Sequence, residues 1–275
     1  MMKALYALLV ASAPLLGFAQ TPDLPDLAYG PAPRQRMDVY LPARADRAPV
    51  LLVVHGGAWM IGNKALPQVV EQKFAHWVRD RGFILVSVNY RLVPEADPPT
   101  QAADVARALA TVQQRAQSWG GDPSRVVLMG HSAGAHLVAL LSARPALAAA
   151  QGAAPWRGTV VLDSAALDTA GLMQRPHLRF YDRAFGADPE VWRSASPTAQ
   201  LSRGALPMLL VCSSQRRDDP CAQSRAFANK TIASGGRAEV LPQDLSHAQI
   251  NAELGRPGAY TAAVDAFIAS VGIAR

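Results

Sequence analysis

The chain has 275 residues, half of them hydrophobic and only 17% charged, with a formal net charge of +6 at pH 7. This composition excludes a disordered chain and suits a sizeable buried core. Because no Pro/Gly/Ser-rich linker divides the sequence, we expect one α/β domain over residues 20–275. The basic residues form no cluster with interleaved aromatic residues, so a nucleic-acid partner is not expected.

The N-terminus has the pattern of a secretory signal peptide. Lys3 precedes an apolar run that ends in a small-x-small site at Ala19. A retained membrane anchor is the alternative, but the run is short for a bilayer span and is broken by Ser12 and Pro14. We therefore expect cleavage after Ala19, a secreted or periplasmic mature protein, and no integral membrane association once residues 1–19 are removed.

Apolar strands alternate with helices along the rest of the chain. Two short strands are expected within residues 27–42, and buried strands at 49–54, 83–88, 126–129, 159–162, 209–212 and 238–241; helices are expected at 67–81, 100–117 with Thr100 as the cap, from about 133, and at 260–270. This alternation predicts a mostly parallel sheet covered by helices on both faces, with catalytic groups at the carboxyl ends of the strands. Residues 165–201 form a short insertion, so a large lid is not expected.

Ser132 is the candidate nucleophile. It is the serine of a G-x-S-x-G pattern that runs from Gly130 to Gly134, between an apolar strand and an apolar helix. The pattern alone is weak evidence, but the sharp strand-to-helix turn that it forms exposes the serine hydroxyl at the helix N-terminus.

A serine nucleophile needs a histidine base. Where the nucleophile, acid and base occur in that order along a chain, the base must follow Ser132, which leaves His177 and His247. We favour His247 because it follows the last strand, where a loop can reach back over Ser132. His177 lies in a polar insertion with no strand before it.

The acid that orients the base is less clearly indicated. Asp218 and Asp219 both follow the strand at 209–212, and the Asp-Pro turn after Asp219 makes it the preferred candidate. Asp163, at the end of the preceding strand, is a further candidate. The sequence thus leaves three candidate carboxylates, with Asp219 ranked first, Asp218 second and Asp163 third.

The oxyanion of the reaction needs backbone N–H donors. We expect them from Ala133, at the start of the helix, and from Gly56 and Gly57, since glycines let a loop approach an incoming carbonyl group. Trp59 and His131 are expected to contact the substrate, although a tryptophan beside a core strand can equally be a packing residue.

Cys212 and Cys221, the only two cysteines of the chain, are expected to form a disulfide because export would expose them to oxidising conditions. The bond would close a small loop around the candidate acid and hold Asp219 within reach of His247. The alternative is two unlinked thiols.

Together these segments resemble the α/β-hydrolase superfamily, in its hormone-sensitive-lipase-like and feruloyl-esterase-like carboxylesterase group. The resemblance is carried by residues 55–59 (HGGAW), 89–95 (NYRLVPE) and 130–134 (GHSAG), with the late aspartate and His247. It implies the α/β-hydrolase fold, with Ser132 as nucleophile, His247 as base, and Gly56, Gly57 and Ala133 as the oxyanion hole. The loop with Asp218 and Asp219 departs from the family pattern, so the resemblance does not choose between them as the acid.

The sequence therefore predicts a serine carboxylesterase that hydrolyses small acyl or aryl esters through an acyl-enzyme, without a metal or organic cofactor. One alternative is an arylformamidase, because kynurenine formamidases carry a similar His-Gly-Gly-x-Trp segment, although export argues against that role. Another is a non-catalytic binding module with the same fold, against which the complete set of serine, aspartate and histidine argues.

Overall fold

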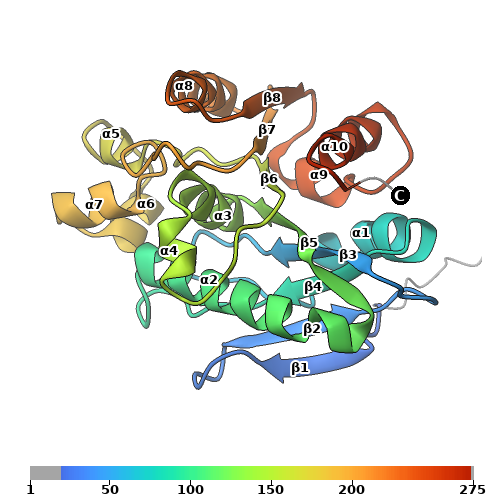
Figure 1. Ribbon diagram of the computed structural model, residues 1–275. Coiled ribbons are helices and arrows are strands. Elements are labelled where there is room, and N and C mark those ends of the chain that lie inside the picture. The colour runs from blue at the N-terminus through green and yellow to red at the C-terminus, as the bar shows by residue number, and fades with distance from the viewer. Residues whose placement is uncertain (1–19, 274–275) are drawn as a thin grey trace, which may run out of the picture.

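A computed structural model of the protein describes residues 20–273, so the expected signal peptide lies outside the described residues. The core is an eight-stranded sheet of order β1-β2-β4-β3-β5-β6-β7-β8 (Figure 1). The strands are β1 (Leu24–Ala28), β2 (Arg36–Tyr40), β3 (Ala48–Val54), β4 (Ile84–Val88), β5 (Gly121–His131), β6 (Gly158–Leu162), β7 (Met208–Ser213) and β8 (Ala238–Gln243). β2 pairs antiparallel with β1 and β4, and all other pairs are parallel. The expected mostly parallel sheet is confirmed.

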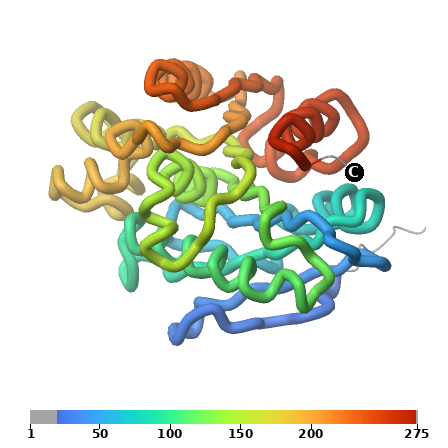
Figure 2. Tube along the Cα trace, viewed as in Figure 1, coloured from blue at the N-terminus to red at the C-terminus, as the bar shows by residue number. Residues whose placement is uncertain are grey.

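Helices cover both faces of this sheet, and the N-terminal and C-terminal strands lie at its opposite edges (Figure 2). They are α1 (Pro67–Lys73), η1 (Phe74–Asp80), α2 (Pro98–Arg115), η2 (Ala116–Trp119), α3 (Ala133–Ala143), α4 (Ala146–Ala149), α5 (Thr169–Met173), α6 (Arg179–Phe185), α7 (Pro189–Ala195), α8 (Pro220–Ala233), α9 (His247–Ala252) and α10 (Ala259–Ser270). Helices α2, α3 and α8 pack on one face, whereas α1, η1 and α10 pack on the other. Within the described residues, no helix is long and apolar enough to cross a bilayer.

β3 shows why the central strands have continuous apolar sequences. Val50, Leu52 and Val54 pack into the core on one face of the sheet, and Leu51 and Val53 pack into the core on the other. Because every side chain of this strand is buried, no polar alternation is possible.

The helix expected over residues 67–81 changes type after Lys73. Residues 74–80 form a π-helix, whose hydrogen bonds span five residues instead of four. The wider turn brings His76, Trp77 and Arg81 to one carboxylate, that of Asp265 on α10, at distances of 2.8, 3.1 and 2.8 Å. The irregular turn thus ties α10 to the sheet.

The cap of α2 also differs from the expectation. The helix begins at Pro98, and the side chain of Asp97 accepts a hydrogen bond from the backbone N–H of Thr100. The helix begins before Thr100 because the two prolines after Asp97 fit its first positions. Asp97 is therefore the cap, and Thr100, the expected cap, supplies the N–H that it accepts.

The insertion between β6 and β7 is short, as expected, and carries α5, α6 and α7. It lies beside the carboxyl ends of the strands, where Phe180 and Tyr181 of α6 line a cavity. The insertion therefore forms one wall of the site described below.

Lys73 is a buried lysine beneath this site. Its side chain is 1% exposed, and its Nζ donates to the backbone oxygen and side-chain Oδ1 of Asn251, at 2.8 and 2.9 Å. It forms no ion pair with a described residue, and burial lowers its pKa to about 7.

This shift predicts a pH dependence of stability. Between about pH 7 and the ordinary lysine pKa, the unfolded chain binds a proton at Lys73 that the folded protein does not, so the free energy of unfolding should rise with pH. Lys73→Met should remove this contribution. Urea unfolding at pH 7.0 and 9.5 measures it: the midpoint should increase more with pH in the wild type than in the variant. Equal increases would contradict the lowered pKa of Lys73.

Candidate active site

Ser132 lies at a strained turn between β5 and α3. Its φ is +57°, a region that non-glycine residues rarely adopt, and its backbone N–H donates to the carbonyl of Leu162 at 2.9 Å. A Cβ on Gly134 would lie 2.3 Å from the carbonyl oxygen of Val54, so only glycine permits this approach of α3 to β3. The G-x-S-x-G pattern thus forms the sharp turn that its sequence predicts.

His247 lies at the first position of α9. Ser246 begins this helix with a capping box in which Gln249 is the other partner. The ring Nδ1 of His247 lies 2.6 Å from Oδ2 of Asp163, the residue that follows β6. Asp163 has a φ of +59° and is fully buried. The structure thus pairs His247 with the carboxylate at the end of the strand next to β5.

The hydrogen bonds around Asp163 favour its ionised form. Burial opposes ionisation, but hydrogen bonds from His247, from Arg216 and from the backbone N–H of Ser213 lower the pKa of the carboxyl group below its usual range. An ionised carboxylate accepts a hydrogen bond from Nδ1–H of His247. This tautomer leaves Nε2 of the ring without a proton and able to accept one.

Arg216 also lies against this pair. Its Nη1 is 3.0 Å from Oδ2 of Asp163, 3.1 Å from the backbone oxygen of Asp163 and 3.1 Å from Nδ1 of His247. Nδ1–H of His247 already donates to Asp163, so it cannot accept from Arg216. The guanidinium hydrogens are therefore directed to Oδ2 and to the backbone oxygen of Asp163. Arg216 therefore fixes the carboxylate that in turn orients His247.

The structure corrects the expected acid, Asp219 or else Asp218. Asp219 caps α8, where its side chain accepts from the backbone N–H of Ala222 at 2.9 Å. Asp218 forms an ion pair with Arg216, with Oδ1 2.9 Å from Nε. Both carboxylates thus have local partners, and neither contacts His247. The third-ranked candidate, Asp163, is the one that does.

The disulfide between Cys212 and Cys221 is confirmed, with the two Cα atoms 5.2 Å apart. From the sequence we expected the loop closed by this bond to hold Asp219 against His247. It does not, because Asp219 caps α8 instead. The loop carries Arg216, whose contacts with Asp163 are described above. The bond therefore encloses the residue that fixes the carboxylate instead of the carboxylate itself.

The three residues expected to supply oxyanion donors all lie close to Ser132. Gly56 and Gly57 line the same cavity as Ser132, and Ala133 opens α3, where the first N–H groups have no partner within the helix. Gly57 has a φ of +122°, and a Cβ there would lie 2.1 Å from the carbonyl oxygen of Ile61. Glycine is thus required for the fold of this loop.

The other histidines have different surroundings. His131 is partly buried and lines the cavity beside Ser132, and burial together with the nearby His247 ring lowers its pKa to about 3, so it is neutral. Its Nε2–H donates to the backbone oxygen of His247 at 2.9 Å. His177, the alternative base, lies in the insertion, 2.9 Å from Asp182 and outside the cavity that contains Ser132.

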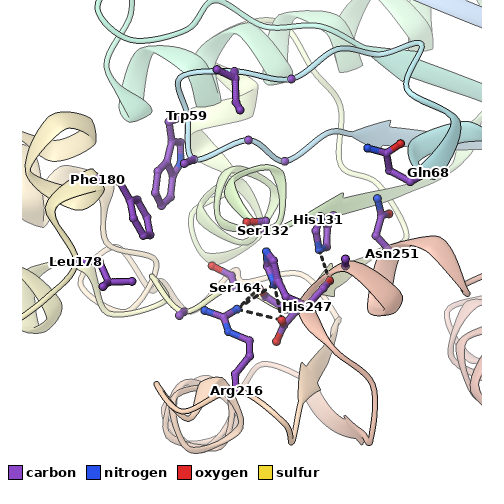
Figure 3. A pocket seen from close by; sticks show the side chains of 18 of the residues that line it. Trp59, Gln68, His131, Ser132, Ser164, Leu178, Phe180, Arg216, His247 and Asn251 are labelled. Carbon is purple, nitrogen blue, oxygen red and sulfur yellow. Dashed lines mark hydrogen bonds and ion pairs between the residues drawn. The ribbon is translucent and has the colours of Figure 1, made fainter.

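A cavity of about 1070 Å³ contains Ser132, Asp163 and His247. Trp59 lines one end of it, with its ring packed against Phe180 and its Nε1 donating to Nδ1 of His136 at 3.2 Å. Figure 3 shows Trp59, Phe180 and Leu178 on one side of Ser132, and Gln68 and Asn251 on the other. The candidate catalytic groups thus lie between an aromatic end and an amide-lined end.

Part of the chain matches a known protein family, and the chain is similar in sequence to known esterases. Residues 37–153 match the BD-FAE family. The chain is 36% identical to esterase LipQ of Mycobacterium tuberculosis over 84% of its own length and 56% of that protein, and 29% identical to the isoprenylcysteine alpha-carbonyl methylesterase ICME of Arabidopsis thaliana over 78% and 54%. It thus spans about half the length of these curated relatives.

Solved structures share the fold. A truncated carbohydrate esterase from gut microbiota superposes with a TM-score of 0.77 at 20% identity, covering 90% of this chain and 95% of that one. Apo esterase 2 of Thermogutta terrifontis gives 0.72 at 23% identity, over 93% and 97%. Together with the elbow at Ser132, these similarities show that the chain has the α/β-hydrolase fold, in which residues 37–153 are similar to the BD-FAE family.

Proposed function

We propose that this chain is a serine carboxylesterase that hydrolyses small acyl or aryl esters through an acyl-enzyme. The observation that carries the proposal is the 2.6 Å contact between His247 and the buried Asp163, in the cavity that also holds Ser132 at its strained turn. A serine, a histidine and an ionised carboxylate in one cavity are the groups that acyl transfer requires.

In this mechanism, Ser132 Oγ attacks the carbonyl carbon of the ester while Nε2 of His247 takes the hydroxyl proton. Asp163 stabilises the imidazolium that forms, and the N–H groups of Ala133, Gly56 and Gly57 stabilise the oxyanion. His247 then protonates the departing alcohol. A water molecule attacks the acyl-enzyme by the same route and releases the acid.

The relatives support ester hydrolysis. LipQ is named an esterase, and ICME a methylesterase. A structure of Thermogutta terrifontis esterase 2, which shares the fold, is phosphonylated by sarin, a reaction typical of an activated serine. The size of the cavity and its aromatic end favour esters with an apolar or aryl arm.

Turnover of a substrate panel tests this function. The panel contains 4-nitrophenyl acetate and butyrate, phenyl acetate, and N-formylkynurenine for the formamidase alternative. We expect hydrolysis of the esters to be faster than hydrolysis of the formamide. Hydrolysis of N-formylkynurenine alone would assign the chain to the arylformamidases, and hydrolysis of none of the four would leave a non-catalytic binding module.

A further inference from the structure

The cavity has a second end that the reaction itself does not use. On the side of Ser132 away from Trp59, the cavity is lined by Gln68 of α1 and Asn251 of α9 (Figure 3). Gln68 is exposed, and its side chain has no hydrogen-bond partner among the described residues. Asn251, in contrast, is only 4% exposed although it lines the cavity. The Asn251 amide is therefore largely withdrawn from bulk solvent.

The orientation of the Asn251 amide is fixed by Lys73. Oδ1 of Asn251 accepts a hydrogen bond from Lys73 Nζ at 2.9 Å, and the protonated form of Lys73, which can only donate, favours this orientation of the amide. The same Nζ donates to the backbone oxygen of Asn251 at 2.8 Å. Lys73 thus holds both oxygens of Asn251 on one side and directs the NH2 group away from itself.

The NH2 group of Asn251 has no acceptor within the described protein. Its Oδ1 is used by Lys73, whereas Nδ2 makes no hydrogen bond to any other described residue. Nδ2 is not among the fully buried polar atoms that lack a partner, so it is open to the cavity, where water or an oxygen of another molecule can accept its hydrogen bond. Because Asn251 lines the cavity that holds Ser132, the bound substrate is in a position to supply it.

We propose that Asn251, oriented by Lys73, is a specificity-determining residue that donates a hydrogen bond to an oxygen in one arm of the ester, while the other arm packs against Trp59 and Phe180. The preferred substrates are esters with one apolar or aryl arm and one arm that carries an ether, carbonyl or hydroxyl oxygen. This inference rests on the proposed esterase function. Lys73 is a positioning residue in it and does not touch the substrate.

Isosteric pairs of esters test the inference, since each pair differs only by a CH2 group replaced with an ether oxygen. In the acyl arm the pair is 4-nitrophenyl pentanoate and 4-nitrophenyl 3-methoxypropanoate. In the alcohol arm it is butyl phenylacetate and 2-methoxyethyl phenylacetate. The quantity measured is the ratio of kcat/KM for the ether to kcat/KM for the alkyl ester, in which the intrinsic reactivities cancel when variants are compared.

Two variants remove the donor in different ways. Asn251→Asp keeps an acceptor for Lys73 but replaces NH2 with a second oxygen, and Asn251→Leu removes the amide altogether. Asn229→Asp and Asn229→Leu are the matched controls, because Asn229 is exposed on α8 and outside the cavity. Since Asn251→Asp preserves the contact with Lys73, it remains informative if Asn251→Leu does not fold.

We expect both Asn251 variants to lower the ether-to-alkyl ratio by about three- to tenfold in one of the two pairs, which corresponds to one lost hydrogen bond. The Asn229 variants should leave both ratios unchanged. If the wild type hydrolyses the esters but both ratios stay within twofold in Asn251→Asp, the role of Asn251 is refuted and the esterase function stands. If the wild type hydrolyses none of the four esters, the function and the inference both fall.

Discussion

Replacement of Ser132 with alanine should lower kcat for 4-nitrophenyl acetate by at least about 10⁴-fold, since the acyl-enzyme cannot form without the nucleophile. The fold should be retained. Alanine must adopt the strained φ of +57° at this position just as serine does, and the backbone hydrogen bond to Leu162 does not involve the side chain. Stopped and continuous assays of the purified variant, with circular dichroism as the check on folding, measure this effect. Activity above one tenth of the wild-type value would show that another residue is the nucleophile.

Asp163→Asn should have the second-largest effect. An asparagine amide can donate to Nδ1 of His247 and so favour the tautomer whose Nε2 carries the proton and cannot accept one from Ser132. We expect kcat to fall by about 10³- to 10⁴-fold with little change in KM.

Asp218→Asn and Asp219→Asn are the matched controls for Asp163→Asn, because they make the same chemical change in the neighbouring loop. Asp219→Asn keeps a good cap for α8, and Asp218→Asn removes only one ion-pair partner of Arg216. Both should stay within about fivefold of the wild-type rate, since neither carboxylate contacts Asp163 or His247. If either control loses as much activity as Asp163→Asn, the geometry described for His247 is not the one used in catalysis.

The sheet could be predicted from the sequence because each central strand is a continuous apolar run. A run such as that of β3, with no polar residue in seven, can only be buried on both faces. The turn at Ser132 was equally predictable, since its glycines and its place between an apolar strand and an apolar helix are local features. The change to a π-helix after Lys73 was not, because the spacing of the apolar residues over 67–81 fits either kind of helix.

The acid was ranked wrongly for a physical reason. A carboxylate in the loop after β7 can accept from His247 only if it has no other partner. Asp218, however, pairs with Arg216, and Asp219 caps α8. Asp163 is instead the single carboxylate that directly follows β6, next to the strand that leads to Ser132. The signals in the sequence were Arg216, which offers Asp218 a nearby partner, and Pro220, which marks Asp219 as the residue that precedes a helix.

Arg216 shows what only the three-dimensional structure could reveal. Its guanidinium reaches Asp163, which lies 53 residues earlier in the chain, and the loop that carries it is closed by the disulfide between Cys212 and Cys221. The disulfide was correctly predicted from the sequence, but its loop was expected to hold Asp219 against His247. The loop instead carries Arg216 to Asp163, a contact that depends on the order of the strands in the sheet.

Labelling with a fluorophosphonate probe, followed by mass spectrometry of the digested protein, tests the central claim most directly, because the probe reacts with an activated serine and not with an ordinary one. We expect one modified residue, Ser132, in the wild type, no modification of the Ser132→Ala variant, and labelling slowed by at least a hundredfold in Asp163→Asn. Modification of a different serine, or no labelling of the folded wild-type protein, would contradict it.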